Sequence, residues 1–225
     1  MAQRIFMLVV LLMATVSLAA AAETVSLSFT IHQEADIYEE SDFGEPPQVA
    51  IWLEDTETGK RQTVYVTYRT ATGDFYGKVE CPVSLPAWVM VWREETGNEG
   101  FPTPKVKAVD AITAATSLEK GISATVSGIP KGKKVVYYIE HNVAADFNAA
   151  YPFEGENNQL DDQRNGQPSL IYRGEITAAP GEISTPKPWA RTEQYQFTGE
   201  MIENLDGMEN ALECLSKIEV TVVKE

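Results

Sequence analysis

The sequence is poor in the residues that most often bind metals or catalyse reactions. Its 225 residues include two cysteines, Cys81 and Cys214, and two histidines, His32 and His141. Neither a C-x-x-C pair nor a C-x-x-C-H motif occurs, which argues against a cysteine zinc site and excludes a covalently attached c-type haem. The P-loop, the G-x-G-x-x-G fingerprint and the G-x-S-x-G elbow are also absent. No nucleophile and base can be paired from the sequence, so a hydrolase is the least favoured class. Whether the protein is an enzyme stays open, and a non-enzymatic role is favoured.

Basic residues are also scarce. The chain has 18 Lys and Arg residues against 33 Asp and Glu residues, a formal net charge of −15. A chain this acidic repels phosphate backbones and anionic lipid surfaces, so neither nucleic acid nor a membrane surface is expected as a partner. Metal ions and basic protein faces remain compatible with the charge, although solubility alone also explains it.

Long apolar runs are absent except at the start of the chain. Arg4 precedes an uncharged apolar run over residues 5–18, and Ala20 and Ala22 then form a small-residue cleavage site before Glu23. This pattern is typical of a secretory signal peptide, and the run is too short to span a hydrocarbon core of about 30 Å. We therefore expect residues 1–22 to be removed, and residues 23–225 to form one domain, periplasmic or secreted, without a membrane span.

Alternation of apolar and polar residues dominates the remainder. Between Thr24 and His32, the apolar residues Val25, Leu27, Phe29 and Ile31 fall on one face, which predicts a half-buried strand. Eight further strands are expected at residues 48–53, 61–68, 87–92, 122–126, 134–140, 169–177, 194–198 and 217–223. The only convincing helix covers residues 208–216, where apolar residues recur at helical spacing. These elements predict an all-β fold, an antiparallel, immunoglobulin-like β-sandwich with one short C-terminal helix.

The two cysteines have two interpretations. In an oxidising compartment the simplest is a disulfide between Cys81 and Cys214, which would tie the helix to the sheet. The alternative is two separate buried thiols.

Three tryptophans, Trp52, Trp88 and Trp92, lie within expected strands. Aromatic residues contribute large apolar burial, so an aromatic layer of the core is one interpretation. The other is an aromatic pocket for a flat ligand such as a flavin, a quinone or a sugar.

Residues 110–117 (DAITAATS) resemble the motif at which extracytosolic flavin carriers attach FMN to a threonine through a phosphoester. In this resemblance Thr116 is the acceptor, but Ala114 stands where the motif has glycine. Glycine permits backbone angles that alanine resists, so the departure favours an ordinary capped turn.

A polar stretch follows residue 140. Its oxygen-bearing side chains suit Ca²⁺, although their spacing matches no EF-hand loop. The candidate calcium ligands are Glu140, Asp146, Asn148, Asp161 and Asp162. A solvated loop with turn-forming Asp and Asn residues is the alternative.

Several of these segments together resemble an uncharacterised family of predicted periplasmic proteins, known as a domain of unknown function. The segments are residues 46–59, 86–92, 109–117, the Glu140-x-Asn142 and Asp146-x-Asn148 stretches, and residues 165–176. The resemblance covers roughly residues 25 to 180. It implies an immunoglobulin-like sandwich in the periplasm, and a link to flavin-linked redox proteins, whose genes often accompany this family.

We therefore expect a periplasmic binding or accessory protein with a protein or small-molecule partner, and the family resemblance associates it with a flavin-linked redox system. Two alternatives stay open: a redox carrier with FMN on Thr116, and a calcium-dependent adhesion or carbohydrate-binding module.

Overall fold

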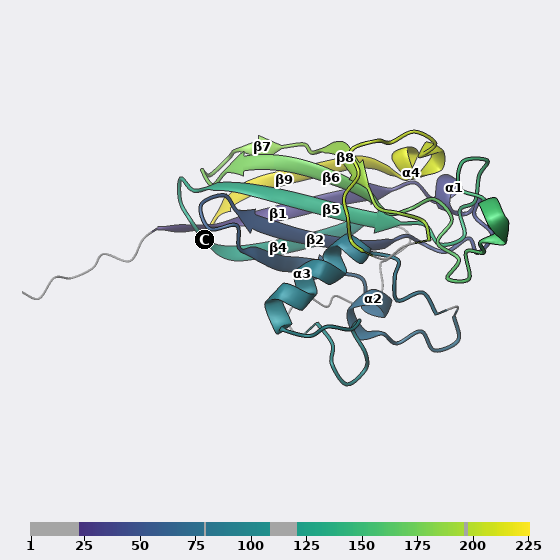
Figure 1. Ribbon diagram of the computed structural model, residues 1–225. Coiled ribbons are helices and arrows are strands. Elements are labelled where there is room, and N and C mark those ends of the chain that lie inside the picture. The colour runs from purple at the N-terminus through teal and green to yellow at the C-terminus, as the bar shows by residue number, and fades with distance from the viewer. Residues whose placement is uncertain (1–22, 79, 109–120, 196–197) are drawn as a thin grey trace, which may run out of the picture.

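Two antiparallel sheets pack face to face (Figure 1). The computed structural model describes residues 23–78, 80–108, 121–195 and 198–225. The four-stranded sheet has the order β4-β1-β9-β7 and consists of β1 (Thr24–Gln33), β4 (Ile122–Pro130), β7 (Ile183–Ser184) and β9 (Leu215–Lys224). The five-stranded sheet has the order β3-β2-β5-β6-β8 and consists of β2 (Gln48–Asp55), β3 (Arg61–Val66), β5 (Lys134–Asn142), β6 (Leu170–Thr177) and β8 (Lys187–Arg191). The predicted β-sandwich is confirmed.

The main core lies between the two sheets. The alternating residues Val25, Leu27, Phe29 and Ile31 of β1 are all at most 1% exposed and point into it. The alternate residues of β5 meet them from the facing sheet, and the ring of Tyr137 packs edge-on against Phe29. The period of two therefore predicted this face correctly, because successive strand residues point to opposite sides of a sheet.

A second core covers the outer face of the five-stranded sheet. The helix α3 (Pro86–Thr96) lies across this face, and α2 (Tyr68–Thr72) lies beside it (Figure 1). Trp52, Trp88 and Trp92 are each at most 1% exposed within this second core. As a result β2 and β5 are buried on both faces, which explains the nearly continuous apolar run of β2.

Three predicted elements need correction. Residues 87–92 belong to the helix α3 and are not a strand. Residues 194, 195 and 198 are not in a strand either, since β8 ends at Arg191. The helix expected over residues 208–216 is the shorter α4 (Glu209–Glu213), because β9 already begins at Leu215.

The remaining helical elements lie at one end of the sandwich. The short helix α1 (Ala35–Tyr38) and the 3₁₀ turn η1 (Glu156–Asn158) lie at the same end as α4 in Figure 1. Among the described residues, no helix has the length and apolar character needed to cross a membrane.

The predicted disulfide is wrong. Cys81 and Cys214 are both free and both buried. Cys214 follows α4, where its carbonyl oxygen accepts a hydrogen bond from the backbone N–H of Glu34 and its side chain joins the core between the sheets. The Cys81 thiol instead donates to Asn165 Oδ1 at 3.4 Å. The two cysteines therefore belong to separate environments, as the alternative interpretation proposed.

Candidate functional site

A pocket of about 410 Å³ opens where the chain enters β2. Its walls come from the turn before β2, from α2, from the segment that follows α2 and from the loop after β5. We call it the Glu45 pocket, and its lining residues are Phe43, Glu45, Arg69, Gly77, Lys78, Cys81 and Ala144. Segments distant in the sequence thus supply the charged and apolar sides of one cavity.

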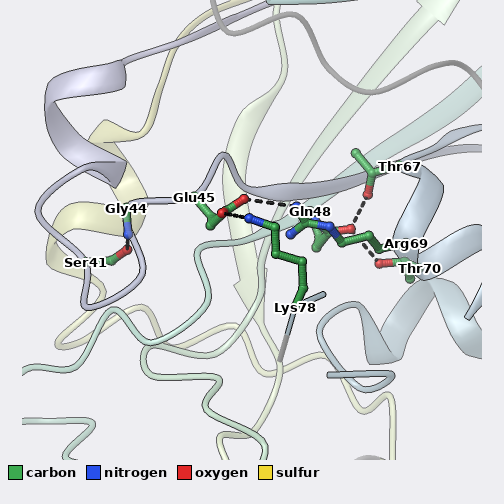
Figure 2. Close-up of polar contacts among 8 residues, drawn as sticks. All are labelled: Ser41, Gly44, Glu45, Gln48, Thr67, Arg69, Thr70 and Lys78. Atoms are coloured by element: carbon green, nitrogen blue, oxygen red, sulfur yellow. Dashed lines mark hydrogen bonds and ion pairs between the residues drawn. The ribbon is translucent and has the colours of Figure 1, made fainter. Parts of the chain in front are cut away.

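Two cations share one carboxylate in this pocket (Figure 2). The guanidinium Nη2 of Arg69 lies 3.0 Å from Glu45 Oε2, and the ammonium of Lys78 pairs with Glu45 Oε1. The hydrogen bond from Lys78 and the charge and hydrogen bond of Arg69 lower the pKa of Glu45 below its ordinary value. Glu45 is therefore ionised at neutral pH, and the pocket retains an excess of one positive charge.

Local structure positions Glu45 and Arg69. Ser41 Oγ accepts the backbone N–H of Gly44 at 3.2 Å, and Gly44 has a φ of +56°, which turns the chain toward Glu45. On the other side of the pocket, Gln48 Oε1 accepts hydrogen bonds from the Thr67 and Thr70 hydroxyls at 2.8 and 3.0 Å. These bonds connect β2 to α2, which carries Arg69 (Figure 2).

Cys81 forms part of the pocket wall and connects it to a buried polar network. Asn165, which accepts the thiol hydrogen bond, donates from Nδ2 to the carbonyl oxygen of Gln194 at 3.3 Å. Burial raises the pKa of Cys81 to about 12, with the negative charge of Asp161 acting in the same direction. The side chain therefore remains a neutral thiol at physiological pH and is a poor nucleophile.

The five predicted calcium ligands are not brought together. Asp146 accepts hydrogen bonds from Gln167 Nε2 at 2.6 Å and Asn210 Nδ2 at 3.1 Å. Asp161 accepts two backbone N–H groups, of Asn165 and Gly166, and the Gln194 amide. Neutral amide donors thus occupy these carboxylates.

The other predicted ligands serve separate purposes. Asn148 Oδ1 accepts the backbone N–H groups of Ala150 and Tyr151, as in an Asx turn, and Asp162 is exposed. In the described part of the chain, no three His, Cys, Asp or Glu residues converge in a way that would hold a metal ion.

Glu140 has a specific role at the start of α3. Its side chain is fully buried, and its two carboxylate oxygens accept the backbone N–H groups of Ala87 and Trp88 at 3.1 and 2.7 Å. The Ser169 hydroxyl donates to Glu140 at 2.5 Å. A carboxyl group at this position satisfies free N–H groups of the helix, and its ionised form interacts favourably with the helix dipole. Glu140 therefore fixes the helix to the five-stranded sheet.

The predicted aromatic residues do come together, but within the second core. The rings of Trp52 and Tyr138 stack with centroids 5.2 Å apart, and Trp88 Nε1 donates to Thr63 Oγ1 at 3.1 Å. Since none of the three tryptophans is more than 1% exposed, they form the aromatic core layer, and they do not line an open cavity. The proposed FMN acceptor, Thr116, lies outside the described residues.

Sequence reasoning missed Glu45, Arg69 and Lys78. The scarcity of basic residues could have drawn attention to Arg69 and Lys78 as candidate binding residues, because they are two of only 18 Lys and Arg residues in the chain. Both lie in the long connection between β3 and β4, and long connections often carry binding residues.

Comparison of the chain with protein-family models, with curated proteins and with solved structures found no match. The family resemblance described above, and with it the link to flavin-linked redox proteins, stays a prediction.

Proposed function

We propose that this protein is an exported, non-enzymatic binding protein that holds a small organic acid in the Glu45 pocket. The observation that carries the proposal is the pair of cations, Arg69 and Lys78, around a single carboxylate in an otherwise acidic chain. The apolar surface of Phe43 and Ala144 beside them suits the carbon skeleton of such a ligand.

The donors available in the pocket support an acidic ligand. Arg69 uses only Nη2 in its ion pair with Glu45, and the Lys78 ammonium has three N–H donors. The remaining N–H groups of the two side chains are donors that pair well with a carboxylate, and guanidinium–carboxylate contacts are among the stronger hydrogen bonds in proteins.

The chemistry of the pocket supports binding over catalysis. The Cys81 thiol stays protonated, and His141 is fully buried on the opposite face of β5 from the second core. Export is supported by the charged start, apolar run and small-residue site of residues 1–22.

Calorimetric titration with succinate, citrate and glutamate tests the proposal. We expect saturable binding of at least one of these acids. Arg69→Gln and Lys78→Gln should each weaken it by about tenfold, which corresponds to the loss of one charge-assisted hydrogen bond. Lys187→Gln is the matched control, because Lys187 is an exposed residue of β8 outside the pocket. Equal affinity in all three variants, or no binding of any acid, would refute the proposal.

A protein partner is the second candidate, and one observation favours it. Tyr76 is 98% exposed and Tyr68 is 43% exposed, and both belong to the segment that carries Arg69 and Lys78. Exposed tyrosines are frequent at the centres of protein interfaces. If this interpretation holds, Tyr76→Ser reduces co-purification of the partner and leaves the binding of organic acids unchanged.

A further inference from the structure

A second cavity, of about 500 Å³, opens at the opposite end of β2 and β5 from the Glu45 pocket. β3 is an edge strand of the five-stranded sheet, and β4 is an edge strand of the four-stranded sheet. The two strands lie side by side, and the cavity lies at this junction. We call the line between these two strands the β3–β4 seam. Among residues 23–78, 80–108, 121–195 and 198–225, no strand closes the sandwich along this line.

The seam exposes part of the core between the sheets. Val64 of β3 and Val126 and Ile129 of β4 pack against that core but are only partly buried. Of these three residues, which we call the apolar strip, Ile129 also lines the cavity, together with the buried residues Leu53 and Val135. Residues 61 to 64 of β3 span about 10 Å at the usual rise of a strand, so the strip has the length of a medium acyl chain.

Cations surround one end of the strip. Lys60, Arg61 and Lys133 line the cavity together with two carboxylates, Asp55 and Glu95. Both carboxylates are already occupied: Asp55 accepts the Lys133 ammonium and the backbone N–H groups of Glu57 and Thr58, and Glu95 accepts the backbone N–H of Thr63 at 2.6 Å. Within the described residues Lys60 forms no ion pair. Arg61 pairs with Glu94 and Lys133 pairs with Asp55, so Lys60 is the cation that the described part of the cavity leaves unpaired beside the apolar strip.

We infer that the β3–β4 seam binds a single-chain fatty acid, with its carboxylate at Lys60 and Lys133 and its acyl chain along Val64, Val126 and Ile129. The cationic side chains favour an anionic head group, and the partly exposed core residues offer an apolar surface to the acyl chain. This site is independent of the Glu45 pocket, because the two cavities share no lining residue.

Calorimetric titration of the purified protein with decanoate tests the inference, with decylamine as the probe of opposite charge. We expect decanoate to bind and decylamine to bind at least tenfold more weakly. Lys60→Glu should weaken decanoate binding by about fivefold to tenfold, because it replaces attraction by repulsion at the surface. Lys187→Glu, the same charge change on β8, should leave the affinity unchanged.

A second pair of variants tests the apolar strip. Val126→Asp should weaken decanoate binding more than tenfold, whereas Val223→Asp, on a 38% exposed residue of β9, should have no effect. Circular dichroism and the melting temperature establish that each variant is folded, and Val126→Ser replaces any that is not. Absence of decanoate binding, or an affinity unchanged by both the Lys60 and the Val126 substitutions, would overturn the inference. The inference would also be overturned if the protein did not bind decanoate and formed a dimer that Val126→Asp dissociates. The seam would then be an interface between two copies of the chain.

Discussion

Two adjacent buried residues of β5 should affect the pH dependence of stability in opposite directions. Glu140 faces α3 and His141 faces the core between the sheets, and both are fully buried. Burial raises the pKa of Glu140 from 4.5 to about 7 and lowers the pKa of His141 from 6.5 to about 4. Neither ring nitrogen of His141 has a hydrogen-bond partner within the described residues.

The sign of each effect follows from which state binds the proton. Between pH 4.5 and about 7, Glu140 is protonated in the folded protein and ionised in the unfolded chain, so the free energy of unfolding falls as the pH rises. Between pH 6.5 and about 4, His141 is neutral in the folded protein and protonated in the unfolded chain, so the free energy of unfolding falls as the pH is lowered. Over the shared range the two slopes cancel.

Substituting one of the two residues should reveal the effect of the other on the pH dependence of stability. A pKa difference of one corresponds to about 1.4 kcal/mol, so each residue accounts for about 3 kcal/mol across its range. For Glu140→Gln we expect unfolding to become about 3 kcal/mol more costly as the pH rises from 4 to 6.5. At every pH, the substitution should also lower the free energy of unfolding by a constant amount of about 1–3 kcal/mol, because the new amide N–H₂ group faces the N–H donors of α3. For His141→Leu we expect the opposite slope.

Urea unfolding of the wild type, both single variants and the double variant, measured across this pH range, provides the test. Other titrating groups are common to all four proteins and cancel in the differences. The double variant should again match the wild type in slope. If the difference between the wild type and Glu140→Gln has the same value at every pH, the reasoning about Glu140 is refuted.

Two further predictions follow from the backbone and the cysteines. Gly166 has a φ of +72°, and a Cβ there would lie 2.5 Å from the backbone nitrogen of Asp146, so Gly166→Ala should lower the free energy of unfolding by about 2–4 kcal/mol in urea titrations. Gly128→Ala is the matched control with a φ of +77° and open space around the new Cβ; a loss as large as that of Gly166→Ala would contradict the role of the close contact. Because Cys81 and Cys214 are free and buried, a thiol reagent should modify both only after unfolding, and dithiothreitol should leave the melting temperature unchanged. A mass two hydrogens lower than that of the reduced chain would contradict this prediction.

The sandwich was predictable because its strands obey the alternation rule on at least one face. β1 and β9 bury alternate residues, and the turns between strands carry glycine at positive φ, as at Gly59 and Gly132. The second core was not predictable in the same way. Trp88 and Trp92 are four residues apart, a spacing that places two side chains on one face of a helix and also on one face of a strand.

The decisive signals for α3 were at its ends. Pro86 occupies the first helical turn, where its missing N–H costs nothing, and Gly97 ends the helix at a φ of +72°. The group that satisfies the start of the helix is Glu140, more than 50 residues away in sequence, and local patterns do not reveal such a partner. The Glu45 pocket was missed for the same reason, because its charged residues come from segments that meet only in the folded protein.

The order of the four-stranded sheet has a consequence for the biosynthesis of the protein. The strand β9 pairs with β1, which is far earlier in the sequence, and also with β7, so this sheet has a gap at its centre until β9 has been synthesised. A growing polypeptide therefore cannot complete this sheet until β9 has left the ribosome. Passage through a translocation channel requires an unfolded chain. For the exported protein that we propose, the late arrival of β9 therefore keeps the chain unfolded for long enough to be translocated.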